Sequence, residues 1–334
     1  IYIKNILSKV YKYYMKILVV QSRMGIGDTV IFLPYIEAIS KKYSVPIDLL
    51  VRESSKAEQF LTDTKYINDI HILDRNDQST GNHDGLLGSI NLIKNLKSKN
   101  FDKIFIFSSS LRFNLIAKLS GIKKIFQYPL FKKNKQQIME TAKSFLKTSI
   151  DVNDFNDPII DIKKDLIEEA IQKFTINRKD TNLLLGIGGS GPTKRVPAKI
   201  FIKFMEKIIV SKRCRFFLAT GKNKEEQKIL NEIMNSKFGK LCVPLDDLSI
   251  KNTLPIIQNC DAAICNDTSF SHLSAALGIN TITLMVDTPL IYGSYSSKMY
   301  PIIPDGETDV THKTLGKDKI NPDKIFEKLI KILN

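Results

Sequence analysis

One unit recurs along the sequence: a short apolar run, a polar turn, and a segment whose apolar residues have helical spacing. Short apolar runs between polar turns are typical of buried strands, and apolar residues spaced by three or four positions are typical of amphipathic helices. Strands that alternate with helices form a mostly parallel sheet with helices on both faces. For the first half we predict strands at 16–20, 47–51, 69–74, 101–108 and 123–128, and helices at 28–43, 55–61, 86–100 and 111–121.

The pattern starts again after a polar stretch, NRKDT, at residues 177–181. Before it, 129–160 lacks a regular pattern and 163–176 predicts a helix. After it, strands are predicted at 182–188, 215–220, 240–245, 261–267 and 280–285, and a closing helix at 321–333. The chain is therefore predicted to hold two successive doubly wound α/β halves. Ligands of such sheets lie beyond the carboxyl ends of the strands, so the default site is the cleft between the halves.

Composition narrows the class of protein. A chain with 43% hydrophobic and 25% charged residues is typical of a soluble globular protein. Its four cysteines include no C-x-x-C pair and look like reduced thiols of a cytosolic protein. No apolar run approaches the ~20 residues of a membrane-spanning helix, and no signal peptide is recognisable. Residues 1–14 predict either a basic amphipathic helix on a membrane or an extension of no consequence before Met15.

The net charge of +15 has two interpretations. It could reflect solvated lysines on helix faces, or attraction to an anionic partner such as nucleic acid, an acidic membrane surface or a phosphorylated substrate. The basic residues are scattered and are not interleaved with aromatic residues in a short patch. This pattern argues against a nucleic-acid-binding protein.

Three strand-to-helix loops could carry chemistry, and the first is QSRMGIGDTVIFLP at 21–34. Gly25 and Gly27 supply two glycines of a dinucleotide fingerprint, but Val30 stands where the third is needed, so the motif fails. The lysine of a Walker phosphate loop is also absent. What remains is a tight turn that delivers Asp28 to the start of a helix. Asp28 could cap that helix, or act as a general base.

The second loop is GGSGPTKRVP at 188–197. Its glycines, Ser190 and Thr193 can offer backbone N–H groups and hydroxyls to a phosphate. Lys194 adds a positive charge, and the helix that follows adds its N-terminal dipole. A glycine-rich turn with a solvent-exposed lysine would look the same in sequence, so both interpretations stay open.

The third loop is CNDTSFSHLSAALG at 265–278. Asp267, Thr268 and Ser269 follow a predicted strand, and His272 falls about one turn into the next helix. Such a helix start can bind phosphate oxygens, with the imidazole beside it. A structural histidine is the alternative.

Several other kinds of site lack a motif in this sequence. No D-x-D pair, no His/Cys cluster with metal-ligand spacing and no G-x-S-x-G turn occurs. We therefore expect no metal cofactor, and a diphosphate would have to be neutralised by helix ends and by lysine or arginine.

Together these stretches resemble glycosyltransferase family 9, the heptosyltransferases of the lipopolysaccharide inner core. The matching segments are MKILVVQSRMGIGDTVIFLPYIEAISKKY, GGSGPTKRVPAKIFIKF, TGKNKEEQKI and AAICNDTSFSHLSAALGINTITL, in the family's order. The resemblance covers roughly residues 15 to 334. Its most specific part is D-T-x-x-x-H-L-x-A-A-L-G, which begins at Asp267.

The resemblance implies a GT-B fold, with two Rossmann-like domains that face a cleft. After the extension at 1–14, it implies an acceptor-binding domain at 15–176, a nucleotide-sugar-binding domain at 177–315, and a closing helix at 316–334 that crosses back onto the first domain. It also implies an inverting, metal-independent transfer of heptose from ADP-heptose to a lipid-linked, anionic glycan acceptor. The enzyme would be cytoplasmic, peripheral on the inner face of the cytoplasmic membrane, and would not bind nucleic acid.

The resemblance implies roles for the residues of this sequence that match the family's motifs. Asp28 matches the proposed general base, in the acceptor-side loop with Gly25 and Gly27. The residues that match the donor site are Ser190, Thr193, Lys194, Asp267, Thr268, Ser269 and His272. Glu225 is assigned beside the donor ribose, with Glu226 as the alternative register.

The sequence departs from the family pattern at two places. Ser269 stands where a glycine usually follows Asp-Thr, and MVDTPLIYGSY at 285–295 replaces a Gly-Pro-Thr stretch and is one residue shorter. Both places belong to the donor side. Another nucleotide-sugar, or a nucleotide-sugar-binding protein that has lost turnover, therefore stays open.

Overall fold

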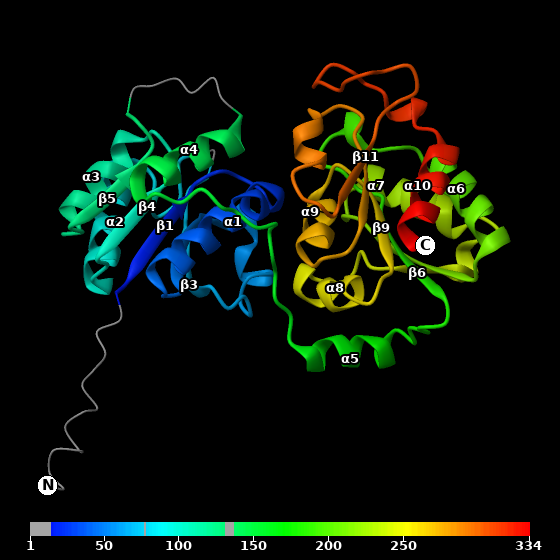
Figure 1. Cartoon of the computed structure of the whole chain (residues 1–334), viewed down its shortest axis with the longest axis horizontal. Helices are drawn as coiled ribbons and strands as arrows, with labels where there is room; N and C mark the ends of the chain where they lie inside the picture. The colour runs from blue at the N-terminus through cyan, green and yellow to red at the C-terminus, as the bar shows by residue number, and fades with distance from the viewer. Residues whose placement is uncertain (1–14, 77, 131–136) are drawn as a thin grey trace, which may run out of the picture. The chain divides into compact units, whose positions relative to one another are not determined.

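The computed structural model describes residues 15–76, 78–130 and 137–334 (Figure 1). The predicted extension at 1–14 lies outside the described residues. The chain folds into two compact units, each with its own sheet. Of the described residues, the first unit comprises 15–24, Tyr35–Ser54 and Lys65–Phe155, and the second comprises Gly25–Pro34, Ser55–Thr64 and Asn156–Asn334. The domain boundaries expected from the family stay a prediction.

The sheet of the first unit has five parallel strands in the order β3-β2-β1-β4-β5. Val20 of the central strand pairs with Leu50 on one side and Ile106 on the other. All residues of β1 and β4 are buried, as expected for strands covered on both faces. The strands are β1 (Ile17–Gln21), β2 (Ile47–Arg52), β3 (Ile67–Leu73), β4 (Lys103–Ile106) and β5 (Lys124–Gln127).

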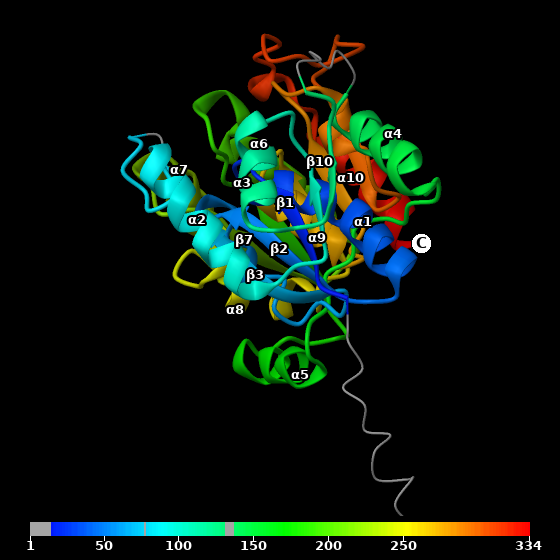
Figure 2. The same cartoon turned by 90° about the vertical axis from the view of Figure 1, so that its left-hand side faces the viewer.

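Helices cover both faces of this sheet (Figure 2). On one face, α2 (Gly85–Lys99) and α3 (Leu111–Leu119) bury Leu92, Leu96, Phe113 and Ile116 against the strands. On the other face lie α1 (Ile26–Tyr43) and α4 (Ile138–Ile150), whose aromatic rings meet Phe105 and Phe107 of the β4 segment. Helix α4 falls in the stretch for which the sequence predicts no regular element.

The sheet of the second unit has six parallel strands in the order β11-β10-β9-β6-β7-β8. One face is covered by α6 (Ala198–Ser211), α7 (Lys224–Met234) and α10 (Pro322–Leu333), whose apolar side chains join a single core. Helices α5 (Lys164–Lys173), α8 (Ile250–Ile257) and α9 (Ser269–Ala276) complete the unit. The strands are β6 (Thr181–Gly186), β7 (Cys214–Ala219), β8 (Cys242–Pro244), β9 (Ala262–Asn266), β10 (Thr281–Leu284) and β11 (Met299–Ile302).

The strand order creates a topological switch point between β6 and β9. These neighbours pair in register, with Gly186 opposite Cys265, yet the chain leaves β6 toward β7 and leaves β9 toward β10. The two outgoing loops therefore diverge, and the carboxyl ends of these two strands are where a ligand of such a sheet is expected. The second and third candidate loops are these two loops.

Other features differ from the sequence-based predictions or complete them. The helix expected at 55–61 is replaced by two short 3-10 turns, Glu53–Ser55 and Ala57–Gln59, with Lys56 between them in the left-handed region at φ 52°. Further 3-10 turns are Pro192–Lys194, Gly239–Leu241, Leu290–Gly293 and Lys317–Lys319. Within 15–76, 78–130 and 137–334, no helix has the length and apolarity needed to cross a bilayer.

Candidate functional site

The loop after β6 is held in shape by two buried side chains. The side-chain amide of Asn266 donates to the carbonyls of Ile187 at 3.0 Å and Gly188 at 2.9 Å. The N–H of Gly189 donates to Oε1 of Glu226 at 2.7 Å. Gly188 has to lack a side chain, because a Cβ there would lie 2.5 Å from the same oxygen. The loop is thus fixed before any ligand binds.

The glutamate in contact with this loop is Glu226. Asn223 caps α7 by accepting from the N–H of Glu226 at 3.0 Å, and its amide returns a short hydrogen bond to the Glu226 carboxylate. These two hydrogen bonds with Asn223 hold the Glu226 side chain toward the loop. Glu225, the residue assigned to the donor ribose from the sequence, is exposed on α7. The structure therefore places Glu226, the alternative to Glu225, in contact with the loop after β6.

An ion pair crosses the switch point. Nζ of Lys194, from the loop after β6, donates to Oδ2 of Asp267, from the loop after β9, at 2.7 Å. The Asp267 side chain is 6% exposed and that of Lys194 is 23% exposed. A buried carboxylate thus orients an ammonium group that keeps access to solvent.

The electrostatics of Asp267 and His272 are set by burial and by each other. Burial alone would raise the pKa of Asp267, but the charges of His272 and Lys194 and the Lys194 hydrogen bond outweigh it and hold this pKa below its usual value. Burial lowers the pKa of His272, against the opposing effect of Asp267. At neutral pH the site therefore holds a carboxylate, an ammonium and a neutral imidazole.

His272 is anchored from its far side. Its Nδ1 lies 2.8 Å from the hydroxyl of Tyr295, and the two rings stack at 5.6 Å between centroids. Its Nε2 lies 3.8 Å from Oδ1 of Asp267. The side chain is 7% exposed, so its orientation is fixed by packing.

The remaining donor-site candidates surround this centre. Thr268 is the N-cap of α9, and its hydroxyl accepts from the N–H of Phe270 at 3.3 Å. Ser269 is the first helical residue and is half-buried. In the other loop, Ser190 is exposed and Thr193 is half-buried in the 3-10 turn that leads to Lys194.

The acceptor-side loop leads into α1. Gly25 has a φ of +100°, which few other residues tolerate. Asp28 lies in the first turn as the third helical residue, so it is not the N-cap of α1. Gly27 belongs to the same compact unit as His272, and a Cβ on Gly27 would lie 2.6 Å from Cδ2 of that ring.

Three of these contact residues were not predicted from the sequence: Asn266, Glu226 as the preferred glutamate, and Tyr295. The spacing of Asn223 and Glu226 is that of a capping box, a sequence signal that could have favoured Glu226 over Glu225. Asn266 lies inside the third loop, directly before Asp267. Tyr295 has no local pattern that would mark it.

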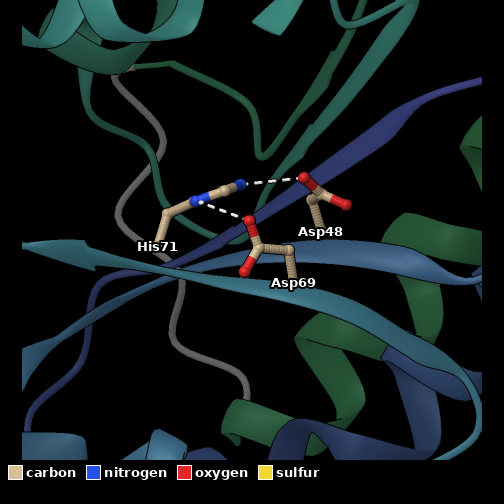
Figure 3. A group of neighbouring side chains, drawn as sticks. All are labelled: Asp48, Asp69 and His71. Carbon is tan, nitrogen blue, oxygen red and sulfur yellow. Dashed lines mark hydrogen bonds and ion pairs between the residues drawn. The ribbon is translucent and has the colours of Figure 1, made fainter. Parts of the chain in front are cut away.

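A separate cluster lies near the start of β2 and β3 in the first unit (Figure 3). His71 lies between Asp48, 2.8 Å from its Nε2, and Asp69, 3.5 Å from its Nδ1. One ligand atom from each residue lies within 4.8 Å of the others, so the group could hold a metal ion. However, each ring nitrogen faces a different carboxylate, and Nζ of Lys99 lies 3.8 Å from Asp69. We therefore interpret the cluster as a hydrogen-bonded bridge between the two strands.

Comparisons with known proteins point to the same architecture. The family model "Glycosyltransferase family 9 (heptosyltransferase)" matches residues 90–305. No curated protein sequence matches. Among solved structures, the chain is similar to ADP-heptose lipopolysaccharide heptosyltransferase II of E. coli, with 18% identity, TM-score 0.73 and coverage of 96% of this chain and 98% of that one. It is also similar to a family 9 glycosyltransferase of Veillonella parvula, with 15% identity, TM-score 0.76 and coverage of 96% and 97%. For the E. coli heptosyltransferase WaaC with ADP, the identity is 13%, the TM-score 0.69 and the coverage 95% and 100%.

Proposed function

Because the chain belongs to glycosyltransferase family 9 and has the GT-B fold, we propose that it transfers heptose from ADP-heptose to a lipid-linked glycan of the lipopolysaccharide-core type. The observation that carries this proposal is the Lys194–Asp267 pair at the switch point between β6 and β9. Two similar solved structures, an ADP-heptose heptosyltransferase and a heptosyltransferase with ADP, support the choice of donor.

On the donor side, the diphosphate would lie between the loop after β6 and the start of α9. Lys194 would meet the phosphate oxygens, with Ser190, Thr193 and the first N–H groups of α9 as further donors. Asp267 would hold the Lys194 ammonium in place rather than touch the phosphate, because two anions repel. As the bond between the anomeric carbon and the phosphate oxygen breaks, this positive charge stabilises the departing ADP.

On the acceptor side, Asp28 would act as general base. Its carboxylate takes the proton from the acceptor hydroxyl while the hydroxyl oxygen bonds to the anomeric carbon, on the side opposite the departing diphosphate. The configuration at that carbon is therefore inverted. The mechanism as proposed requires no metal, because Lys194 and the helix dipole supply the positive charge that a diphosphate needs.

The place of action follows from the acceptor. A lipid-linked, anionic glycan would be met at the inner face of the cytoplasmic membrane, and the net charge of +15 favours a negatively charged surface. We do not propose that the protein binds nucleic acid.

The proposal is tested by direct transfer. The purified chain is incubated with ADP-heptose and a lipid-linked core acceptor, with and without EDTA, and the product is followed by mass spectrometry. Calorimetry against ADP-, GDP-, UDP- and CMP-sugars runs in parallel. A product that forms equally well in EDTA supports the proposal. Tight binding of ADP-heptose without transfer would instead favour a protein that has lost turnover. Binding of another nucleotide-sugar alone would show that ADP-heptose is not the donor.

A further inference from the structure

The outer surface of α2 and α3 in the first unit is unusually apolar. Apart from Met24, Ile159, Val210, Leu241 and Leu315, the exposed large hydrophobic side chains within 15–76, 78–130 and 137–334 all lie on these two helices. Leu86 is 86% exposed, Leu87 78% and Leu119 65%. The six side chains of this α2–α3 surface are Leu86, Leu87, Ile90, Leu111, Leu115 and Leu119.

The spacing of these residues makes them one surface. Leu111, Leu115 and Leu119 recur every fourth position and form a row along α3, and Leu86 and Ile90 do the same on α2. Because both helices pack on the same face of the sheet, their outward faces lie on the same side of the first unit.

The two helices are also tied to each other. Arg112 of α3 donates from Nε to Oγ of Ser89 on α2 at 2.9 Å, and its Nη2 makes a short hydrogen bond to the carbonyl of His83, just before α2. A surface fixed in this way does not have to order itself before a partner binds.

The charge around this surface is strongly one-sided. Residues 85–130 contain eight lysines and arginines, of which Lys103 is buried in β4, and one acidic residue, Asp102; Asp84 directly precedes α2. Lys94, Lys97 and Lys118 are exposed on the same two helices as the apolar row. Apolar side chains flanked by lysines suit the boundary between headgroups and acyl chains of an anionic bilayer, where leucines enter the boundary and ammonium groups meet lipid phosphates.

We propose that the α2–α3 surface docks the enzyme onto an anionic lipid bilayer. This inference rests on the proposed function for its purpose, since it would bring the first unit to a lipid-linked acceptor. A protein partner would bury leucines equally well, but it would not by itself account for the near absence of acidic residues over 85–130. The excess of positive charge therefore favours an anionic membrane over a protein as the partner of the α2–α3 surface.

The test is flotation of the full chain with vesicles of phosphatidylcholine, with or without phosphatidylglycerol. We expect binding to the anionic vesicles, little binding to pure phosphatidylcholine, and release at about 1 M salt, where charges are screened within roughly 3 Å. K97Q/K118Q should bind roughly 30-fold more weakly, because each lysine near an anionic surface contributes about 1 kcal/mol. L115Q/L119Q should lose at least as much, because it removes two leucines that enter the bilayer. Glutamine keeps helix propensity, and melting curves confirm that each variant folds.

Matched control variants come from the other unit. Val210 on α6 is 87% exposed, and V210Q should bind vesicles as the wild type does. K203Q/K228Q removes two lysines from α6 and α7 and should have a far smaller effect than K97Q/K118Q. Equal losses in both lysine pairs would overturn the proposal in favour of unspecific attraction by net charge.

Two further results would overturn it. One is wild-type protein that stays unbound to anionic vesicles. The other is a dimer in gel filtration that L115Q/L119Q dissolves while vesicle binding is unchanged, because the leucines would then cover a second copy of the chain. The vesicle assay contains neither donor nor acceptor. Calorimetry with ADP-heptose on the same variants therefore separates a failed membrane surface from a failed proposed function.

Discussion

Nζ of Lys194 lies 2.7 Å from Oδ2 of Asp267, and this contact joins the two loops that diverge from β6 and β9. The carboxylate is nearly inaccessible and the ammonium is partly exposed. The Asp267 carboxylate accepts from one N–H group of Lys194 and so holds the ammonium in position. The other N–H groups of Lys194 remain available for a phosphate. Substitutions at this pair should therefore change donor binding more than substitutions at exposed ion pairs.

Asp267→Asn should weaken binding of ADP-heptose roughly tenfold, because the amide no longer holds the Lys194 ammonium by charge. Calorimetry measures the effect. The matched control is Asp247→Asn, which breaks an exposed lysine–aspartate pair, Lys222–Asp247 at 2.9 Å, and should leave donor binding unchanged. Equal losses in both variants would argue against a positioning role for Asp267.

Asp28→Asn should lower the rate of transfer by about 10²- to 10⁴-fold with little change in donor affinity, because it removes a base and leaves the donor-binding residues in place. Asp165 occupies the first turn of α5 as Asp28 occupies that of α1, so Asp165→Asn is the matched control. If Asp28→Asn lost donor affinity as strongly as turnover, the assignment as base would be wrong.

His272 should make the protein less stable in mild acid. Its pKa is lowered by burial from the usual 6.5, so the unfolded chain takes up a proton more readily than the folded chain. The contribution of neutral His272 to the free energy of unfolding is fully present above pH 6.5. It is lost as the pH falls through the pKa that His272 has in the folded protein. Urea unfolding of His272→Gln should therefore show a shallower loss between about pH 7 and 5.

His71→Leu should destabilise the first unit by about 1–3 kcal/mol, because Asp48 loses a hydrogen bond that its half-buried carboxylate needs. Asp69 is 55% exposed, so Asp69→Asn should cost well under about 1 kcal/mol. Zn²⁺ should leave the melting temperature of the wild type unchanged. A rise with Zn²⁺ that His71→Leu abolishes would show that the cluster is a metal site.

Much of the fold follows from local pattern. The apolar runs at 16–20 and 182–188 became β1 and β6, because a buried parallel strand needs apolar residues on both faces. Strand β11 was missed because it contains Pro301, which is unfavourable inside a sheet. Here the proline is tolerated because β11 is the edge strand. Helix α4 was not predicted, although its buried residues Met139, Ala142, Phe145 and Leu146 recur with helical spacing.

The candidate site, like the fold, could be predicted from the sequence only in part. Lys194, Asp267 and His272 could be found because each follows a strand in a motif with a chemical purpose, and the structure brings them together. The anchoring of His272 could not be predicted, since it depends on Tyr295, a residue with no local signal. The choice between Glu225 and Glu226 also depended on a contact with another loop.

Calorimetric titration of ADP-heptose into Lys194→Ala tests the central claim most directly. A charged hydrogen bond to phosphate contributes about 1.5–3 kcal/mol, so the affinity should fall roughly 10- to 100-fold relative to the wild type. Lys199→Ala, at an exposed position at the start of α6, should bind as the wild type does. Wild-type affinity in Lys194→Ala would contradict the account, because the lysine held by Asp267 would then play no part in binding the donor.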